Sequence, residues 1–85
     1  MRRFNLGLAS LFLPLITFAG PVNINTADAE TIAQELNGIG LAKARAIVQF
    51  REQNGAFQLP EEVLKVKGIG PRVLAANREH IKISD

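Results

Sequence analysis

Two copies of the tripeptide Gly-Ile-Gly carry the clearest chemical signal in this sequence. They lie at Gly38–Gly40 and Gly68–Gly70, and each stands between two stretches with the apolar spacing of a helix. An apolar residue between two glycines, directly before a helix, predicts a tight turn that leaves the first helical N–H groups without partners. Those amides and the positive end of the helix dipole form a site for an anion. Two such sites on one short chain predict a grip on a long anion, with nucleic acid as the expected candidate.

The net charge gives no separate support for a nucleic-acid partner. The 85 residues include ten Lys and Arg against eight Asp and Glu, which gives a net charge of +2. Arg2 and Arg3 account for this excess, so residues 20–85 carry eight charges of each sign. A polyanion must therefore be held by backbone amides and local basic side chains rather than by overall attraction.

Residues 1–19 are predicted to be an export signal. Two arginines precede an apolar stretch over residues 4–18, and the small residues Thr17 and Ala19 place a signal-peptidase cut before Gly20. The stretch is shorter than the roughly 20 residues of a membrane span, and a proline interrupts it. We therefore expect no stable membrane anchor after cleavage. A retained anchor and a buried core helix remain as alternatives.

Residues 20–85 are predicted to form one small all-α domain with two similar halves. The first hairpin spans about 29–53, with helices near 29–36 and 41–53, and the second spans about 60–81, with helices from Pro60 and from Pro71. Each half is too small to bury its apolar face alone, so the halves must pack on each other. No strand pattern is present. Without cysteine, apolar packing alone must hold the domain, and its expected core includes Leu41, Ala44, Ile47, Phe57, Leu59, Val63 and Leu64.

The remaining polar residues predict no enzyme. His80 is the only histidine, and no Ser/His/Asp set accompanies it. The pair Glu61-Glu62 suits the start of a helix better than acid–base chemistry. Neither glycine turn continues into a dinucleotide-binding or nucleotide-hydrolase loop. We expect no cofactor, no metal site and no small-molecule substrate.

Each turn belongs to a longer pattern that resembles a known motif. The pattern apolar-x-Gly-apolar-Gly before a helix, at Leu36–Gly40 and Val66–Gly70, looks like the helix-hairpin-helix motif. Residues 20–85 as a whole resemble the ComEA family, which are exported DNA receptors of natural transformation. An export signal directly before the domain is similar to the short Gram-negative members. The further segments that carry this resemblance are Val22–Ala27, Lys43-Ala44, Phe50–Glu52, Gly55, Phe57 and Pro71.

The resemblance implies a periplasmic protein that binds double-stranded DNA without sequence preference. The tandem motifs would straddle the minor groove and hold backbone phosphates, and the DNA-uptake machinery is a further expected partner. Lys67 is either a phosphate contact or a solvated side chain. The contacts implied by the resemblance, together with Lys67, are Gly38, Ile39, Gly40, Ala42, Lys43, Lys67, Gly68, Ile69, Gly70 and Arg72.

Two departures from the family pattern affect the first turn. Asn37 and Leu41 stand where the family often has proline, whereas Pro71 is present after the second turn. We therefore expect the first turn to be the less rigid one. The isoleucines should anchor both turns in the core, and Arg51 and Arg78 are expected to be surface charges.

Other classes of function remain open on the sequence alone. The same fold can serve as a periplasmic protein-interaction module, which the balanced charge of residues 20–85 favours. A DNA-repair accessory domain shares the motif but conflicts with an export signal.

Overall fold

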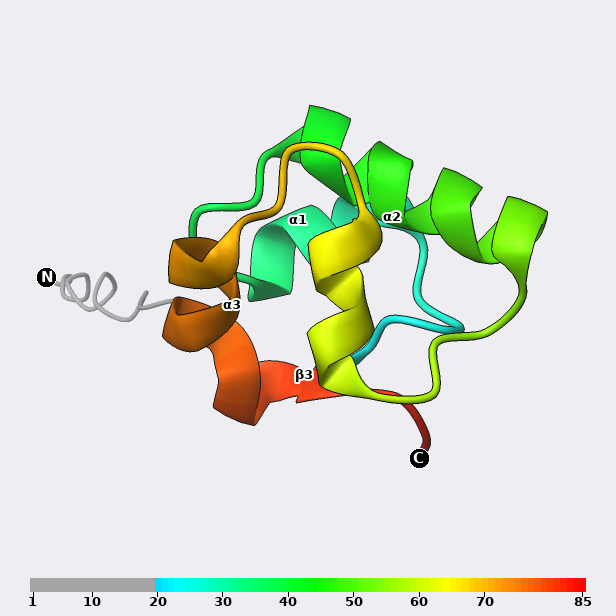
Figure 1. The fold of residues 1–85 in the computed structure, drawn as a ribbon. Coiled ribbons are helices and arrows are strands. Elements are labelled where there is room, and N and C mark those ends of the chain that lie inside the picture. Colours follow the sequence, from blue (N-terminus) through cyan, green and yellow to red (C-terminus); the bar gives the residue numbers. More distant parts are fainter. Residues whose placement is uncertain (1–19) are drawn as a thin grey trace, which may run out of the picture.

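The computed structural model describes residues 20–85, and the predicted export signal lies outside them (Figure 1). None of the helices in this part of the chain is long and apolar enough to span a membrane. The elements follow in the order β2 (Val22–Asn23), α1 (Ala29–Glu35), α2 (Leu41–Asn54), η2 (Pro60–Lys65), α3 (Pro71–Asn77), η3 (Arg78–His80) and β3 (Ile81–Lys82), where η denotes a 3₁₀ helix.

The boundaries of α1 and α2 follow from local signals in the sequence. Asp28 caps α1, because its carboxylate accepts a 2.8 Å hydrogen bond from the N–H of Thr31. Gly55 ends α2 with φ of 90°, a backbone conformation that favours glycine. These two helices match the predicted ranges within one residue at each end.

The second half of the chain is less regular than predicted. The segment Pro60–Lys65 is a 3₁₀ helix, with bonds from Glu62 N to Leu59 O and from Val66 N to Val63 O. Because a 3₁₀ helix has three residues per turn, Val63 and Val66 share one face and are both buried. The same geometry turns Leu64 outward.

Three leucines in the expected core are exposed. Leu64 lies on the outer face of η2, and Leu59 precedes this helix with 56% of its surface accessible. Leu41 is the first residue of α2 and lies at the surface beside the first glycine turn. The expected core was therefore wrong at these positions, although Ala44, Ile47, Phe57 and Val63 are buried as predicted.

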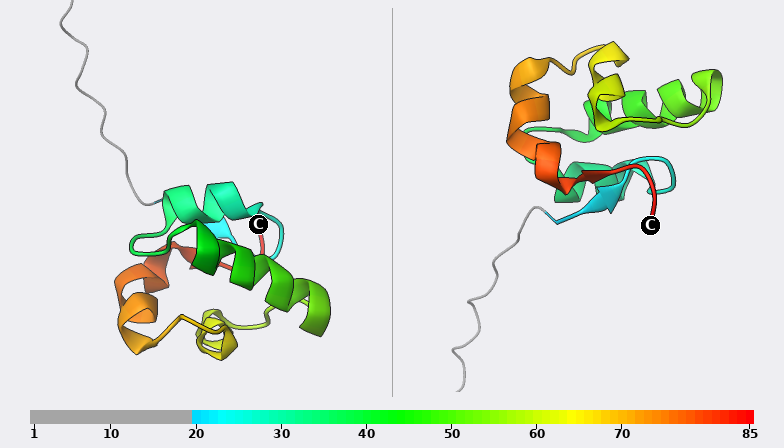
Figure 2. Two further views of the ribbon diagram at one scale, coloured as in Figure 1. Left: turned by 90° about the horizontal axis from the view of Figure 1, so that it is seen from above. Right: turned by 60° about the horizontal axis from the view of Figure 1, so that its bottom comes forward.

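A short parallel strand pair joins the two ends of the described chain. Val22 pairs with Ile81 and Asn23 with Lys82, so β2 and β3 lie side by side in the right-hand view of Figure 2. The predicted fourth helix therefore ends early, because α3 stops at Asn77 and a turn of 3₁₀ helix leads into β3. The domain is mostly helical, with one strand pair that the sequence pattern did not predict.

Asn25 fastens the segment after β2 to two distant parts of the chain. Its amide forms reciprocal bonds with the Phe57 backbone, at 2.7 and 3.0 Å, and a further 3.0 Å bond to Ile83 O. The Phe57 ring is buried and stacks on Phe50, with 5.3 Å between ring centroids. Both aromatic rings therefore serve packing, and the burial of Phe57 was predicted.

Candidate nucleic-acid interface

The two Gly-Ile-Gly turns have similar backbone conformations at their glycines. We call Gly38-Ile39-Gly40 turn 1 and Gly68-Ile69-Gly70 turn 2. The first glycine of each has a positive φ, 76° in turn 1 and 95° in turn 2. The isoleucines are only 4% and 5% exposed, so they anchor both turns in the core as expected. The second glycine of each turn is extended and forms the N-cap of the following helix.

The fold itself requires glycine only at the first position of each turn. Gly40 and Gly70 have φ of −79° and −110°, which any residue adopts. A Cβ placed on either of them would meet no protein atom within 4 Å. The absence of a side chain there therefore leaves open space directly in front of two helix starts, where a ligand can approach the backbone closely.

A pair of serine substitutions separates these two roles of glycine. Gly68→Ser places a side chain at φ of 95° and should lower the free energy of unfolding by about 1–2 kcal/mol. Gly70→Ser should leave stability unchanged or slightly higher, since serine is a good N-cap. Urea unfolding followed by circular dichroism measures both. Equal destabilisation by the two variants would contradict this assignment.

The helices after the two turns differ at their starts from the other helices of the described chain. α1 has an aspartate cap and Glu30 in its first turn, and hydrogen bonding from Thr31 lowers the pKa of that Asp28 cap. η2 carries Glu61 and Glu62 in its first turn. By contrast, α2 and α3 have no side-chain cap and no carboxylate in their first turn. Their positive ends are left free for an external anion.

The open amides of α2 include those of two predicted site residues, Ala42 and Lys43. The hydrogen bond from Ala44 N to Gly40 O, at 2.9 Å, is the first of the helix. The N–H groups of Leu41, Ala42 and Lys43 precede it and have no partner within the helix. In α3 the first helical hydrogen bond runs from Leu74 N to Gly70 O. Because Pro71 has no N–H, α3 has fewer open backbone donors at its start than α2.

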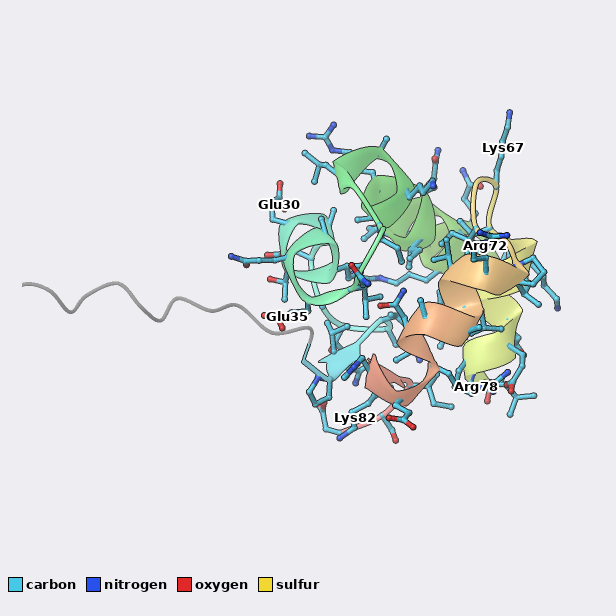
Figure 3. The ribbon with its side chains drawn as sticks, turned by 90° about the vertical axis from the view of Figure 1, so that its left-hand side faces the viewer. Glu30, Glu35, Lys67, Arg72, Arg78 and Lys82 are labelled. Atoms are coloured by element: carbon cyan, nitrogen blue, oxygen red, sulfur yellow. The ribbon has the colours of Figure 1, made fainter. Side chains whose placement is uncertain are left out.

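Lys43 brings the two turns into one surface. A Cβ on Gly68 would lie 3.5 Å from Lys43 Cγ, so the alkyl chain of this half-buried lysine passes along turn 2. Lys67 and Arg72, on either side of turn 2, are exposed and lie at the same end of the domain (Figure 3). Glu30 and Glu35 lie on a different side of the molecule. The structure thus brings Lys43 of the first half to turn 2 of the second.

A buried asparagine that the sequence analysis missed holds turn 1 in place. Asn77 is fully buried, and its Oδ1 accepts from the N–H of Asn37 at 2.7 Å. Its Nδ2 donates to Asn37 O at 2.8 Å and to Val73 O at 2.9 Å. Turn 1 is therefore fastened to α3, the helix that begins at turn 2. The available signal for Asn77 was its place three residues after Leu74, on the buried face of α3. The lower rigidity expected of turn 1 relative to turn 2 stays a prediction.

Two arginines expected to be surface charges, Arg51 and Arg78, have partners within the domain. Arg51 Nη1 donates to Ile24 O at 2.7 Å and to Ala27 O at 2.6 Å, which holds the segment before α1. Arg78 pairs with Glu61 at the surface, and this hydrogen bond lowers the pKa of the Glu61 carboxyl. Both are therefore less suited to an external anion than Lys43, Lys67 and Arg72.

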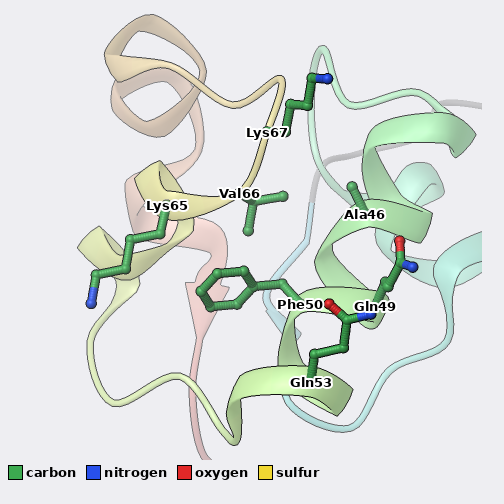
Figure 4. Close-up of a pocket in the computed structure, with 7 residues that line it drawn as sticks. All are labelled: Ala46, Gln49, Phe50, Gln53, Lys65, Val66 and Lys67. Atoms are coloured by element: carbon green, nitrogen blue, oxygen red, sulfur yellow. The ribbon is translucent and has the colours of Figure 1, made fainter.

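A shallow hollow lies beside turn 2 (Figure 4). It lies between α2 and the end of η2, and the polar groups around it are two glutamines and two lysines. No group of three or more His, Cys, Asp or Glu side chains in the described residues could hold a metal ion. The lining residues are Ala46, Gln49, Phe50, Gln53, Lys65, Val66 and Lys67.

Comparison with known proteins identifies the class. A family described as the helix-hairpin-helix motif matches residues 18–82, so the chain belongs to the helix-hairpin-helix family. Within it the chain is ComEA-like: it is 51% identical over 51 residues to ComE operon protein 1 of Bacillus subtilis, covering 60% of this chain and 24% of that protein. It is also 52% identical over 60 residues to an uncharacterized protein of Haemophilus influenzae, covering 71% and 54%. The chain thus spans about half of one relative and a quarter of the other.

Proposed function

We propose that this protein is an exported, sequence-independent double-stranded DNA-binding protein that holds DNA in the periplasm during natural transformation. The observation that carries the proposal is the pair of glycine turns, each followed by a helix start without cap or carboxylate. Membership in the helix-hairpin-helix family and similarity to ComE operon protein 1 support a role in competence. The similarity to a short relative in Haemophilus influenzae fits the Gram-negative type of the family.

In this proposal the two halves act as tandem helix-hairpin-helix motifs on one duplex. Backbone amides of turn 1 and of Ala42 and Lys43 bind phosphates of one strand, and those of turn 2 and Arg72 bind the other. The side chains of Lys43, Lys67 and Arg72 add positive charge beside these amides. Since no base edge is contacted, binding is independent of sequence. The protein works by binding alone, and DNA-uptake machinery is its further partner.

The first test is a gel shift with random duplex DNA. The processed protein should shift the duplex at micromolar concentration in low salt, because non-specific binding depends on phosphate contacts. No shift at tens of micromolar protein would contradict DNA binding. It would favour a periplasmic protein-interaction module, the alternative that the eight charges of each sign in residues 20–85 also fit.

Charge reversal at two site residues tests the position of the interface. Lys43→Glu combined with Arg72→Glu should weaken duplex binding about a hundredfold, because two phosphate contacts become repulsions. The far-ultraviolet circular dichroism spectrum should stay unchanged, since neither side chain is fully buried.

Lys82→Glu serves as the control for a charge reversal outside the proposed interface. Lys82 lies on β3, well away from Lys67 and Arg72 in Figure 3. Its reversal makes half the change in net charge of the double variant and should weaken binding only a few fold. A folded double variant that keeps full affinity would contradict this placement of the interface.

A further inference from the structure

A contact that the proposed DNA binding does not explain lies at Gly20, the first described residue. The backbone N–H of Gly20 donates to Glu35 Oε1 at 3.0 Å, across 15 positions of the sequence. A Cβ on Gly20 would lie 2.9 Å from the same oxygen, so the carboxylate approaches the backbone where glycine leaves room. Glu35 thus holds the residue at which the predicted signal-peptidase cut would begin the mature chain.

The position of Glu35 in α1 favours a positively charged partner for its carboxylate. Glu35 is the last residue of this helix, and no basic side chain stands in its last turn. A carboxylate at the C-terminal end of a helix is unfavourable because the dipole there is negative. A neutral backbone N–H offsets this only partly, whereas a charged donor makes a shorter and stronger hydrogen bond.

The strand pair keeps residue 20 close to Glu35. Val22 is buried and pairs with Ile81 in β3, only two residues after Gly20. The backbone nitrogen of Gly20 is therefore held close to α1, because β2 is paired with β3. Loss of the preceding residues would leave this short lead-in in place.

We infer that Glu35 is the binding site for the protein's own mature amino terminus, formed when a signal peptidase cuts between Ala19 and Gly20. In that step water adds across the peptide bond, leaving a carboxylate on Ala19 and an α-amine on Gly20 that takes up a proton at neutral pH. The resulting ammonium forms an ion pair with Glu35 in place of the neutral hydrogen bond. This inference rests on the proposed export but not on DNA binding. Processing thereby adds a charged contact between the chain start and α1.

The test begins with the full chain, expressed with its own leader in a bacterial host and purified after export. Intact mass spectrometry should show a chain that begins at Gly20. The α-amine is then labelled with cyanate near neutral pH, where the deprotonated amine is the reactive form. Glu35→Gln should accelerate this labelling about threefold, because loss of the ion pair lowers the pKa of the amine by about half a unit.

Glu30→Gln is the matched control. Glu30 is exposed on the same helix, so its loss removes one carboxylate from α1 without touching Gly20. It should leave the labelling rate within a factor of about 1.5. Equal rates for Glu35→Gln and wild type, or a mature chain that begins elsewhere, would overturn the inference. Either result would leave the gel-shift test of DNA binding unaffected.

Discussion

Gly40→Asp is expected to stabilise the domain and to weaken duplex DNA binding by about tenfold or more. The two effects have one cause, since an aspartate at the N-cap of α2 would occupy the amides that we assign to phosphate. We expect the free energy of unfolding to rise by about 0.5 kcal/mol. Urea unfolding and duplex titration at fixed salt measure the two changes.

The backbone of Gly40 is already suited to this substitution. Its φ and ψ are −79° and 179°, and those of Asp28, which caps α1, are −80° and 169°. An aspartate at position 40 can therefore make the same side-chain bond that Asp28 makes to Thr31. A Cβ at this position meets no protein atom within 4 Å, so no clash opposes it.

Ser84→Asp provides the control for charge alone. Ser84 is exposed in the C-terminal tail, and its substitution adds the same single negative charge. It should change duplex affinity less than twofold. A Gly40→Asp variant that is stably folded and keeps full affinity would contradict the role of the α2 start in binding.

Asn77→Ala is expected to cause the largest loss of stability among single substitutions in the interface. Truncation leaves the N–H and C=O of Asn37 without the partner that now bonds both. The free energy of unfolding should fall by about 2–3 kcal/mol. That is a large part of the roughly 3–10 kcal/mol expected for a domain of this size. Because turn 1 is released from α3, duplex affinity of the folded fraction should fall as well.

Asn54→Ala is the matched control, with the same substitution at an exposed site. The Asn54 amide donates only to Phe50 O, near the end of α2. Loss of this bond should lower the free energy of unfolding by no more than about 0.5 kcal/mol. Urea unfolding followed by circular dichroism at 222 nm measures both variants. Similar losses for the two asparagines would contradict the assignment of Asn77 as the fastener of turn 1.

The features that the sequence predicted correctly are local ones. The bounds of α1 and α2, which Asp28 and Gly55 set, and the burial of Ile39 and Ile69 each follow from a few adjacent residues and their conformational preferences. Both Gly-Ile-Gly segments likewise form turns directly before a helix, as their repeated pattern predicted. Such features need no knowledge of which segments meet in space.

The features that the sequence did not predict depend on contacts between distant segments. β2 and β3 contain two residues each, and Val22 pairs with Ile81 only because the two chain ends meet. The bonds of Asn77 to Asn37 span 40 positions of the sequence. An asparagine in a helix is expected at the surface unless its neighbours in space are known. The passage of Lys43 along Gly68 has no local signature either.

The structure adds direct links between the two turns. The sequence already predicted that both turns grip one polyanion, with turn 1 the less rigid because Pro71 follows only turn 2. The bonds of Asn77 and the position of Lys43 tie turn 1 to α3 and the first half to turn 2. We therefore expect the two turns to bind DNA as one unit, so that damage to either weakens the whole interface.

The salt dependence of duplex binding tests the central claim most directly. If both turns engage and about four phosphates are contacted, log K should fall against log salt with a slope of about −3.6. The slope should be the same for duplexes of unrelated sequence. A slope near zero, or affinity that depends on the sequence of the duplex, would contradict a two-turn grip on the phosphate backbone.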